Sequence, residues 1–105
     1  MKVFKANRWW QRAGGLLIRP KLLAEEVLWL QPCWSVHTFG MRYSIAVFFL
    51  DQNNVILKVK TYVAPNRIVF CLGAKSVCEM LPILSDHCDS TSEALIRSLS
   101  LNTAT

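Results

Sequence analysis

The chain has 105 residues, of which 52% are hydrophobic, and a formal net charge of +5. This length fits one domain with its own core, so we expect a single domain over residues 1–105. The longest apolar run, residues 45–50, is too short to span a membrane, and the start of the chain lacks the apolar run and cleavage site of a secretory signal. These features exclude a transmembrane helix and predict a cytoplasmic protein.

The first fifth of the chain is basic. It holds half of the Lys and Arg residues and no acid: Lys2, Lys5, Arg8, Arg12, Arg19 and Lys21. Residues 6–13 contain no helix breaker and precede two glycines, which predicts a short N-terminal helix. With Trp9 and Trp10, this segment could bind nucleic acid, an anionic membrane surface or a protein partner. The alternative is a solvated helix face whose tryptophans pack on the core. A basic pI alone is weak evidence for nucleic acid, so we do not expect a nucleic-acid ligand.

Beyond Pro20 the pattern is mainly β. Residues 27–31 predict a short strand. Residues 43–50 are largely apolar at both odd and even positions, which predicts a strand covered on both faces. Residues 51–54, DQNN, predict a turn that leads into a strand over residues 55–63, completing a hairpin. In this strand, strict alternation places one set of residues together: Val55, Leu57, Val59, Thr61 and Val63. The opposite face then carries Ile56, Lys58, Lys60 and Tyr62.

The rest of the chain predicts a second turn at residues 64–67 and two short strands at residues 68–72 and 76–81. Residues 89–105 read as a polar tail. Within it, Ser90 and Glu93 match a capping box, which predicts a short C-terminal helix. The expected fold is a small β-sandwich or barrel-like domain with a short helix near each end.

The decapeptide PCWSVHTFGM places Cys33, His37 and Met41 at intervals of four residues. In an extended chain or a helix such residues share a face, and thiolate, imidazole and thioether ligands suit a soft ion such as copper(I). One ion could bind all three only if the segment folds back as a loop. The alternative is that Cys33 and Met41 fill the core while His37 fixes the loop by a hydrogen bond. We favour packing and expect no cofactor.

The four cysteines, at positions 33, 71, 78 and 88, form no CxxC pair, so we expect reduced and mostly buried thiols. The cluster formed by residues 86–89, DHCD, contains a histidine and a cysteine, but adjacent residues rarely face each other productively. No hydrolase or phosphate-loop motif is present. We therefore do not predict an enzyme.

Four arginines stand out as possible ligand-binding groups: Arg12, Arg19, Arg42 and Arg67. Guanidinium groups bind carboxylate and phosphate in a bidentate manner, so arginines beside His37 and Thr38 could bind an anionic small molecule or a sugar acid. The alternative is pairing within the protein, with Glu79, Asp51 or backbone carbonyls.

Several spaced motifs agree in order with one family. They are RAGGLLIR at residues 12–19, LQPCWSVHTFGMRYSIAVFFLD at residues 30–51, and the later APNR and SVCEML. Over about residues 6–88 the chain resembles the domain of unknown function 192 family. The resemblance implies a compact β domain of sandwich or barrel type with a short helix near the start, and no established activity. The chain departs from the family pattern at Ala46, where relatives usually have aspartate, at Ser85–Asp86 in place of Gly-Asp, and at Asn54 in place of glycine.

Three hypotheses for function follow. The first is a non-enzymatic binding or accessory module whose pocket lies near residues 37–42 and involves Arg12, Arg19, His37, Thr38, Met41 and Arg42. The second is a soft-metal or redox protein that uses Cys33, His37 and Met41. The third is an interaction subunit that docks its N-terminal segment on a membrane-associated or secretion assembly. The third predicts that deletion of residues 1–10 abolishes association without unfolding the core.

Overall fold

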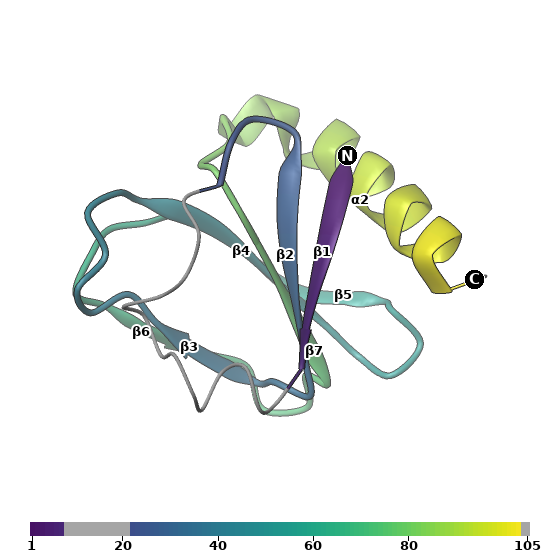
Figure 1. Cartoon of the computed structure of the whole chain (residues 1–105), viewed down its shortest axis with the longest axis horizontal. Coiled ribbons are helices and arrows are strands. Elements are labelled where there is room, and N and C mark those ends of the chain that lie inside the picture. The colour runs from purple at the N-terminus through teal and green to yellow at the C-terminus, as the bar shows by residue number, and fades with distance from the viewer. Residues whose placement is uncertain (8–21, 104–105) are drawn as a thin grey trace.

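The computed structural model describes residues 1–7 and 22–103, in which seven strands form two sheets and one α-helix follows them (Figure 1). The strands are β1 (Lys2–Asn7), β2 (Glu26–Gln31), β3 (Ser35–His37), β4 (Ile45–Leu50), β5 (Ile56–Val63), β6 (Ile68–Phe70) and β7 (Ser76–Met80). A 3-10 turn, η1 (Ser85–His87), leads into helix α2 (Cys88–Thr103). The prediction of a mainly β fold is confirmed.

The larger sheet has five strands in the order β1-β2-β7-β4-β5. Strand β1 pairs with β2 in parallel, and all other pairs are antiparallel. Strands β3 and β6 form a separate antiparallel pair, in which Val36 lies opposite Val69. The inner side chains of this pair, Val36 and Val69, pack towards the core beneath the larger sheet.

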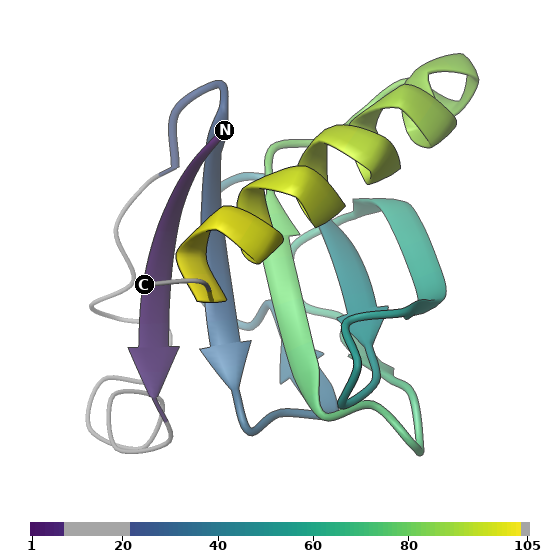
Figure 2. The ribbon, with the colours of Figure 1, turned by 90° about the vertical axis from the view of Figure 1, so that its right-hand side faces the viewer.

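The core has two layers, one on each face of the larger sheet. Ile45, Val47 and Phe49 of β4 belong to the layer shared with the β3–β6 pair, which we call the loop-side core. Ala46, Phe48 and Leu50 belong to the opposite layer, the helix-side core, which α2 covers (Figure 2). All six residues of β4 are buried. This confirms the prediction of a strand covered on both faces.

The turn before β5 has the chemistry that its sequence predicts. The side-chain Oδ1 of Asp51 accepts hydrogen bonds from the backbone N–H groups of Asn53 (2.8 Å) and Val55 (2.9 Å). Asn54 has φ 62°, a conformation that asparagine and glycine tolerate better than other residues. The residue that replaces the family's usual glycine therefore suits the same backbone geometry.

The predicted faces of β5 are wrong. Register shifts occur between Phe49 and Leu50 and between Ile45 and Val47 of β4, so β5 carries extra residues opposite its partner. Each extra residue reverses the parity of the strand. As a result Ile56 and Val59 both pack on the helix-side core, whereas Leu57 is exposed.

Helix α2 is longer than the short helix expected within a polar tail. It begins at Cys88, two residues before the predicted cap, and Ser90 Oγ donates to the carbonyl of His87 (3.1 Å). Leu95 and Leu99 are completely buried in the helix-side core. Because α2 has few leucines and many polar residues, its sequence did not indicate that it forms part of the core.

The start of the chain forms a strand that overlaps the first two residues of the predicted helix. Ala6 and Asn7 end β1, so the predicted N-terminal helix over residues 6–13 is not seen, and its remaining residues lie outside the described part of the chain. Lysines suit an edge strand because charge discourages pairing with another sheet. The Lys5 ammonium lies 5.1 Å from the centroid of the Trp29 ring, a cation–π contact with a buried side chain.

Deletion of residues 1–7 is expected to lower the free energy of unfolding by about 2 kcal/mol or more, because it removes a hydrogen-bonded strand and the contacts of Met1 and Val3 with the helix-side core. Urea denaturation followed by circular dichroism measures this change. An unchanged midpoint would contradict it. The expectation that residues 1–10 can be removed without affecting the core therefore does not fit the sheet.

Candidate functional site

A shallow groove of about 300 Å³ lies between β5 and β6, next to the loop that the sequence singles out. Its lining comes from the end of β5, the following turn and the start of β6: Lys60, Tyr62, Val63, Ala64, Arg67, Ile68 and Val69. Lys60, Tyr62 and Arg67 are exposed. The groove therefore offers two cations and one aromatic ring above an apolar floor.

Thr38 joins the turn at residues 64–67 to the loop that follows β3. Its hydroxyl donates to the carbonyl of Ala64 (2.7 Å) and accepts from the backbone N–H of Arg67 (2.8 Å). The backbone of Thr38 adds bonds to the carbonyl of Arg67 (2.8 Å) and from the N–H of Asn66 (2.9 Å). Asn66 has φ 64°, which fits a tight turn. Thr38 thus holds one wall of the groove by four hydrogen bonds.

The chain segment that forms the groove is basic, and aromatic side chains lie beside it. Residues 52–70 contain three Lys and Arg residues and no acid. On the outer side of the β3–β6 pair, His37 lies opposite Ile68, and its ring centroid is 5.3 Å from that of Phe39. Phe70 is exposed as well, and the Lys58 ammonium donates to its carbonyl (3.0 Å).

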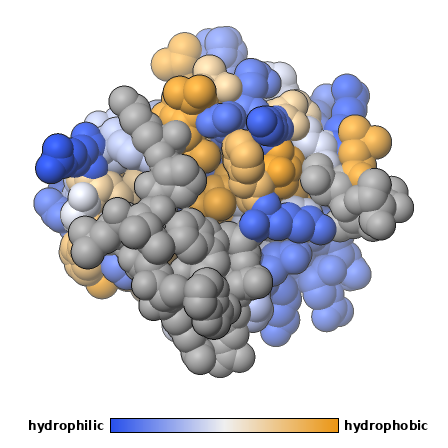
Figure 3. Space-filling view, in the orientation of Figure 1, coloured by the Kyte–Doolittle hydropathy of each residue, from blue (hydrophilic) through white to orange (hydrophobic). Residues whose placement is uncertain are grey.

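Apolar side chains also reach the surface elsewhere. The exposed large ones include Trp34, Leu57, Leu72 and Leu84. On the face seen in Figure 3, apolar side chains lie in patches between hydrophilic ones. The high apolar content of the sequence thus supplies both a two-layered core and exposed apolar surface.

The structure distributes the predicted binding residues between core and surface. His37 and Arg42 are exposed, Thr38 is fully buried, and Met41 packs against the loop-side core. Arg12 and Arg19 lie outside the described residues. Arg67 donates from Nη1 to the carbonyl of Asn66 (3.3 Å), the kind of turn contact expected as one alternative for the arginines.

The three potential metal ligands do not face one way. Cys33 is buried in the loop-side core, where its thiol donates to the carbonyl of Ser35 (3.1 Å), and Met41 packs against the same core. His37 is on the exposed side of β3. Within residues 1–7 and 22–103, no cluster of three or more His, Cys, Asp or Glu residues could hold an ion. Metal binding stays an alternative hypothesis, which elemental analysis of the protein and of His37→Ala tests.

The four cysteines are free thiols, as expected, and differ in accessibility. Cys33 and Cys78 are buried, whereas Cys71 and Cys88 are half-buried. Burial raises the pKa of the Cys78 thiol far above its ordinary value, and the negative charge of Glu79 raises it further. Cys78 is therefore a packing residue rather than a nucleophile.

Iodoacetamide is expected to alkylate Cys71 and Cys88 in the folded protein at mildly alkaline pH, and to spare Cys33 and Cys78 until urea unfolds it. The reason is that the reactive thiolate must be both formed and reachable. Peptide mass spectrometry of labelled protein reads the sites. Early modification of Cys78 would contradict the packing described for β7.

Lys60 and Tyr62 were not selected from the sequence as binding residues. The regular alternation of residues 55–63 placed them on the outer face of an ordinary strand. Nothing in that pattern indicated the register shift through which Lys60 pairs with Val47. The signal that could have found them is the concentration of cations without acids in residues 52–75.

None of the helices in the described part of the chain is long and apolar enough to cross a membrane.

Comparison with known proteins extends the resemblance seen in the motifs. No protein with a curated description matches the chain. A crystal structure of a protein of unknown function from Novosphingobium aromaticivorans is similar, with a TM-score of 0.65 and 16% sequence identity. The similarity covers 81% of this chain and 66% of that one, so the chain spans slightly less than two thirds of its neighbour. The two proteins share the fold.

The sequence profile of domain of unknown function 192, described as "Uncharacterized ACR", matches residues 1–91. The match includes the His-Thr loop, the hairpin and β7, and extends slightly beyond the residues 6–88 that the motifs indicate. The chain belongs to the domain of unknown function 192 family.

Proposed function

We propose that this protein is a binding module for a small anionic ligand with a ring, of the sugar-acid class, and that the groove between β5 and β6 is its site. The observation that carries the proposal is the convergence of Lys60, Arg67 and Tyr62 on one groove beside the loop at residues 37–42. Cations with an adjacent aromatic face are the groups that a carboxylated ring requires.

The groups in the groove have capacity left for a ligand. Arg67 Nη1 makes one long bond to the carbonyl of Asn66, and a guanidinium carries five N–H donors. Donors that remain can bind a carboxylate in a bidentate manner, while Lys60 contributes a second positive charge. Tyr62 is 65% exposed, so an apolar ring face can stack on its side chain.

The predicted loop contributes by support rather than by contact. Thr38 is fully buried, and its hydroxyl is bonded on both sides. It therefore fixes the backbone of Arg67, from which the guanidinium extends. A positioned arginine loses less conformational entropy on binding than a mobile one.

A cytoplasmic location is part of this proposal because all four cysteines are free thiols, as is usual where disulfides do not persist. Fractionation of cells that express the chain, followed by immunoblotting, tests the location. Recovery of the protein outside the cytoplasmic fraction would overturn it.

The test is titration with D-glucuronate, with D-glucose as the uncharged analogue, by isothermal calorimetry. We expect glucuronate to bind more tightly than glucose, and the affinity to fall as salt rises. Arg67→Gln and Lys60→Gln should each weaken glucuronate binding by about fivefold, the effect of an exposed ion pair.

Lys75→Gln is the matched control. The substitution removes the same charge at a distance from the groove. The backbone N–H of Lys75 donates to the carbonyl of Leu50, at one end of β4, whereas the groove lies beside the pair Ile45–Val63 at the other end. Equal weakening by Lys75→Gln, or equal affinity for glucose and glucuronate, would overturn the proposal.

A further inference from the structure

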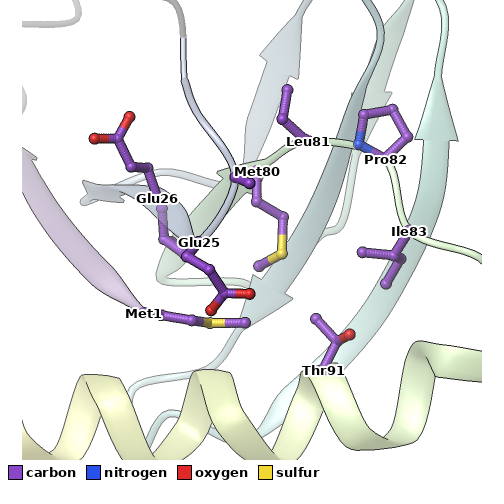
Figure 4. A pocket seen from close by; sticks show the side chains of 10 residues that line it. Met1, Glu25, Glu26, Met80, Leu81, Pro82, Ile83 and Thr91 are labelled. Atoms are coloured by element: carbon purple, nitrogen blue, oxygen red, sulfur yellow. The ribbon is translucent and has the colours of Figure 1, made fainter.

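A second pocket lies on the helix side of the larger sheet and differs from the groove in charge. Its volume is about 260 Å³, slightly below the roughly 300–1,000 Å³ of typical small-molecule sites. It is formed where β2 begins and β7 ends, beneath the first turn of α2 (Figure 4). Its lining is Met1, Ala24, Glu25, Glu26, Val27, Met80, Leu81, Pro82, Ile83 and Thr91.

The pocket is apolar apart from its acidic rim. Met80 and Val27 come from the helix-side core, and Ile83 packs against that core. Methionine side chains are flexible and polarisable, so they adapt to the shape of an apolar ligand. Figure 4 shows the thioether of Met80 directed into the space that Ile83 and Thr91 bound on the other side. The interior thus suits a short hydrocarbon.

Of the two carboxylates at this pocket, that of Glu25 is placed to bind a positive charge. Glu26 Oε1 accepts from the backbone N–H of Leu23 (2.8 Å), and its carboxylate points away from the pocket. The carboxylate of Glu25 instead lies between the side chains of Met1 and Met80 (Figure 4). Among the described lining residues, none is Lys, Arg or His, and the one basic group is the N-terminal amine of Met1.

The surrounding charge agrees with this arrangement. The two segments that build the pocket, residues 22–30 and 76–93, contain six of the seven acidic residues of the chain and no Lys or Arg. One of the six, Glu79, is buried on the other face of the sheet, because it pairs with Val47 of the loop-side core. Lys2 pairs with Glu26 in the strand register, but its ammonium lies over the Phe4 ring, 5.1 Å from the centroid. On a chain of net charge +5, this end of the sheet attracts cations.

We propose that this pocket binds a small organic cation, a primary ammonium on a short alkyl chain, with the ammonium at Glu25 and the alkyl chain against Met80 and Ile83. The first turn of α2 carries a partial positive charge that opposes a cation, but Asp89 in that turn offsets it. The ligand is opposite in charge to that of the groove, so the two sites are independent.

The test uses n-hexylammonium, with n-hexanol and hexanoate as analogues of the same length, followed by the methyl resonances of the three methionines. Hexylammonium is expected to shift the Met1 and Met80 methyl signals and to leave Met41, which packs on the loop-side core, unchanged. Glu25→Gln should weaken binding by about fivefold, and added salt should weaken it as well.

Glu93→Gln is the charge-matched control, because Glu93 is exposed on α2 and does not line this pocket. Glu25→Asn is a second variant that preserves the fold, since Glu25 has φ 66° and asparagine tolerates that conformation better than glutamate. Equal binding of hexanol and hexylammonium would overturn the cation assignment. A lack of Met80 shifts up to the solubility limit of hexylammonium would overturn the site.

Discussion

Replacement of Thr38 by valine is expected to lower the free energy of unfolding by about 2–4 kcal/mol, although valine has nearly the same shape. The hydroxyl of Thr38 bonds to the carbonyl of Ala64 and to the N–H of Arg67, and the residue is fully buried. Valine would remove the hydrogen-bond partner of both backbone groups, which are partly buried. Each such group costs about 1–3 kcal/mol.

Thr38→Ser is the control because it keeps the hydroxyl and loses only a methyl group, which costs about 1 kcal/mol. Urea denaturation of the three proteins, with equal slopes, gives the comparison. The same valine variant should weaken glucuronate binding, because the turn that carries Arg67 is no longer fixed. A serine variant as unstable as the valine variant would show that packing, and not hydrogen bonding, is the role of Thr38.

Leu99→Ala is expected to have a similar or larger effect, about 2–5 kcal/mol, because it leaves a cavity in the helix-side core. Proteins of this kind are stable by only about 5–15 kcal/mol in total. The loss would therefore be visible as a large decrease in the denaturation midpoint. It would show that the C-terminal residues are part of the core rather than a tail.

Leu101→Ala provides a matched control two residues along the same helix. Both changes replace leucine with alanine in a helix, so helix propensity changes equally, but Leu99 is 0% exposed and Leu101 is 73% exposed. The Leu101 variant should stay within about 0.5 kcal/mol of the parent. Equal effects of the two substitutions would contradict the orientation of α2 on the sheet.

The central hairpin could be predicted from sequence because its signals are local. β4 is apolar at every position, and the Asp51 turn carries side chains that bond their own backbone. Neither feature depends on the rest of the fold. The motifs of the family are also local stretches of sequence, and the match to the family profile confirmed the membership that they indicated.

The missed elements depend on distant partners. β1 is a strand because β2 lies beside it, while its lysines and short length resemble those of a solvated segment. β3 was not predicted: it is only three residues long and is held by its pairing with β6. α2 has only a few apolar residues, but the sheet buries Leu95 and Leu99 completely. Tertiary context decides each of these, and a single sequence does not contain it.

The groove was predicted only in part for the same reason. The loop at residues 37–42 was identified by its motif, but the side chains that face the groove come from β5 and the next turn. Thr38 connects the two through hydrogen bonds to residues 64–67, a separation of 26 to 29 positions in the chain. Sequence reasoning thus identified the loop that supports the proposed site and missed most of the side chains that line it.

The most direct test of the binding role is to map where D-glucuronate contacts the protein by ¹H–¹⁵N correlation spectra during a titration. We expect progressive, saturable shifts at Lys60, Tyr62 and residues 67–69, with little change at Glu25 and Thr91 in the acidic pocket. Shifts that spread evenly over the basic surface, or that are absent at residues 60–69, would contradict a site in the groove.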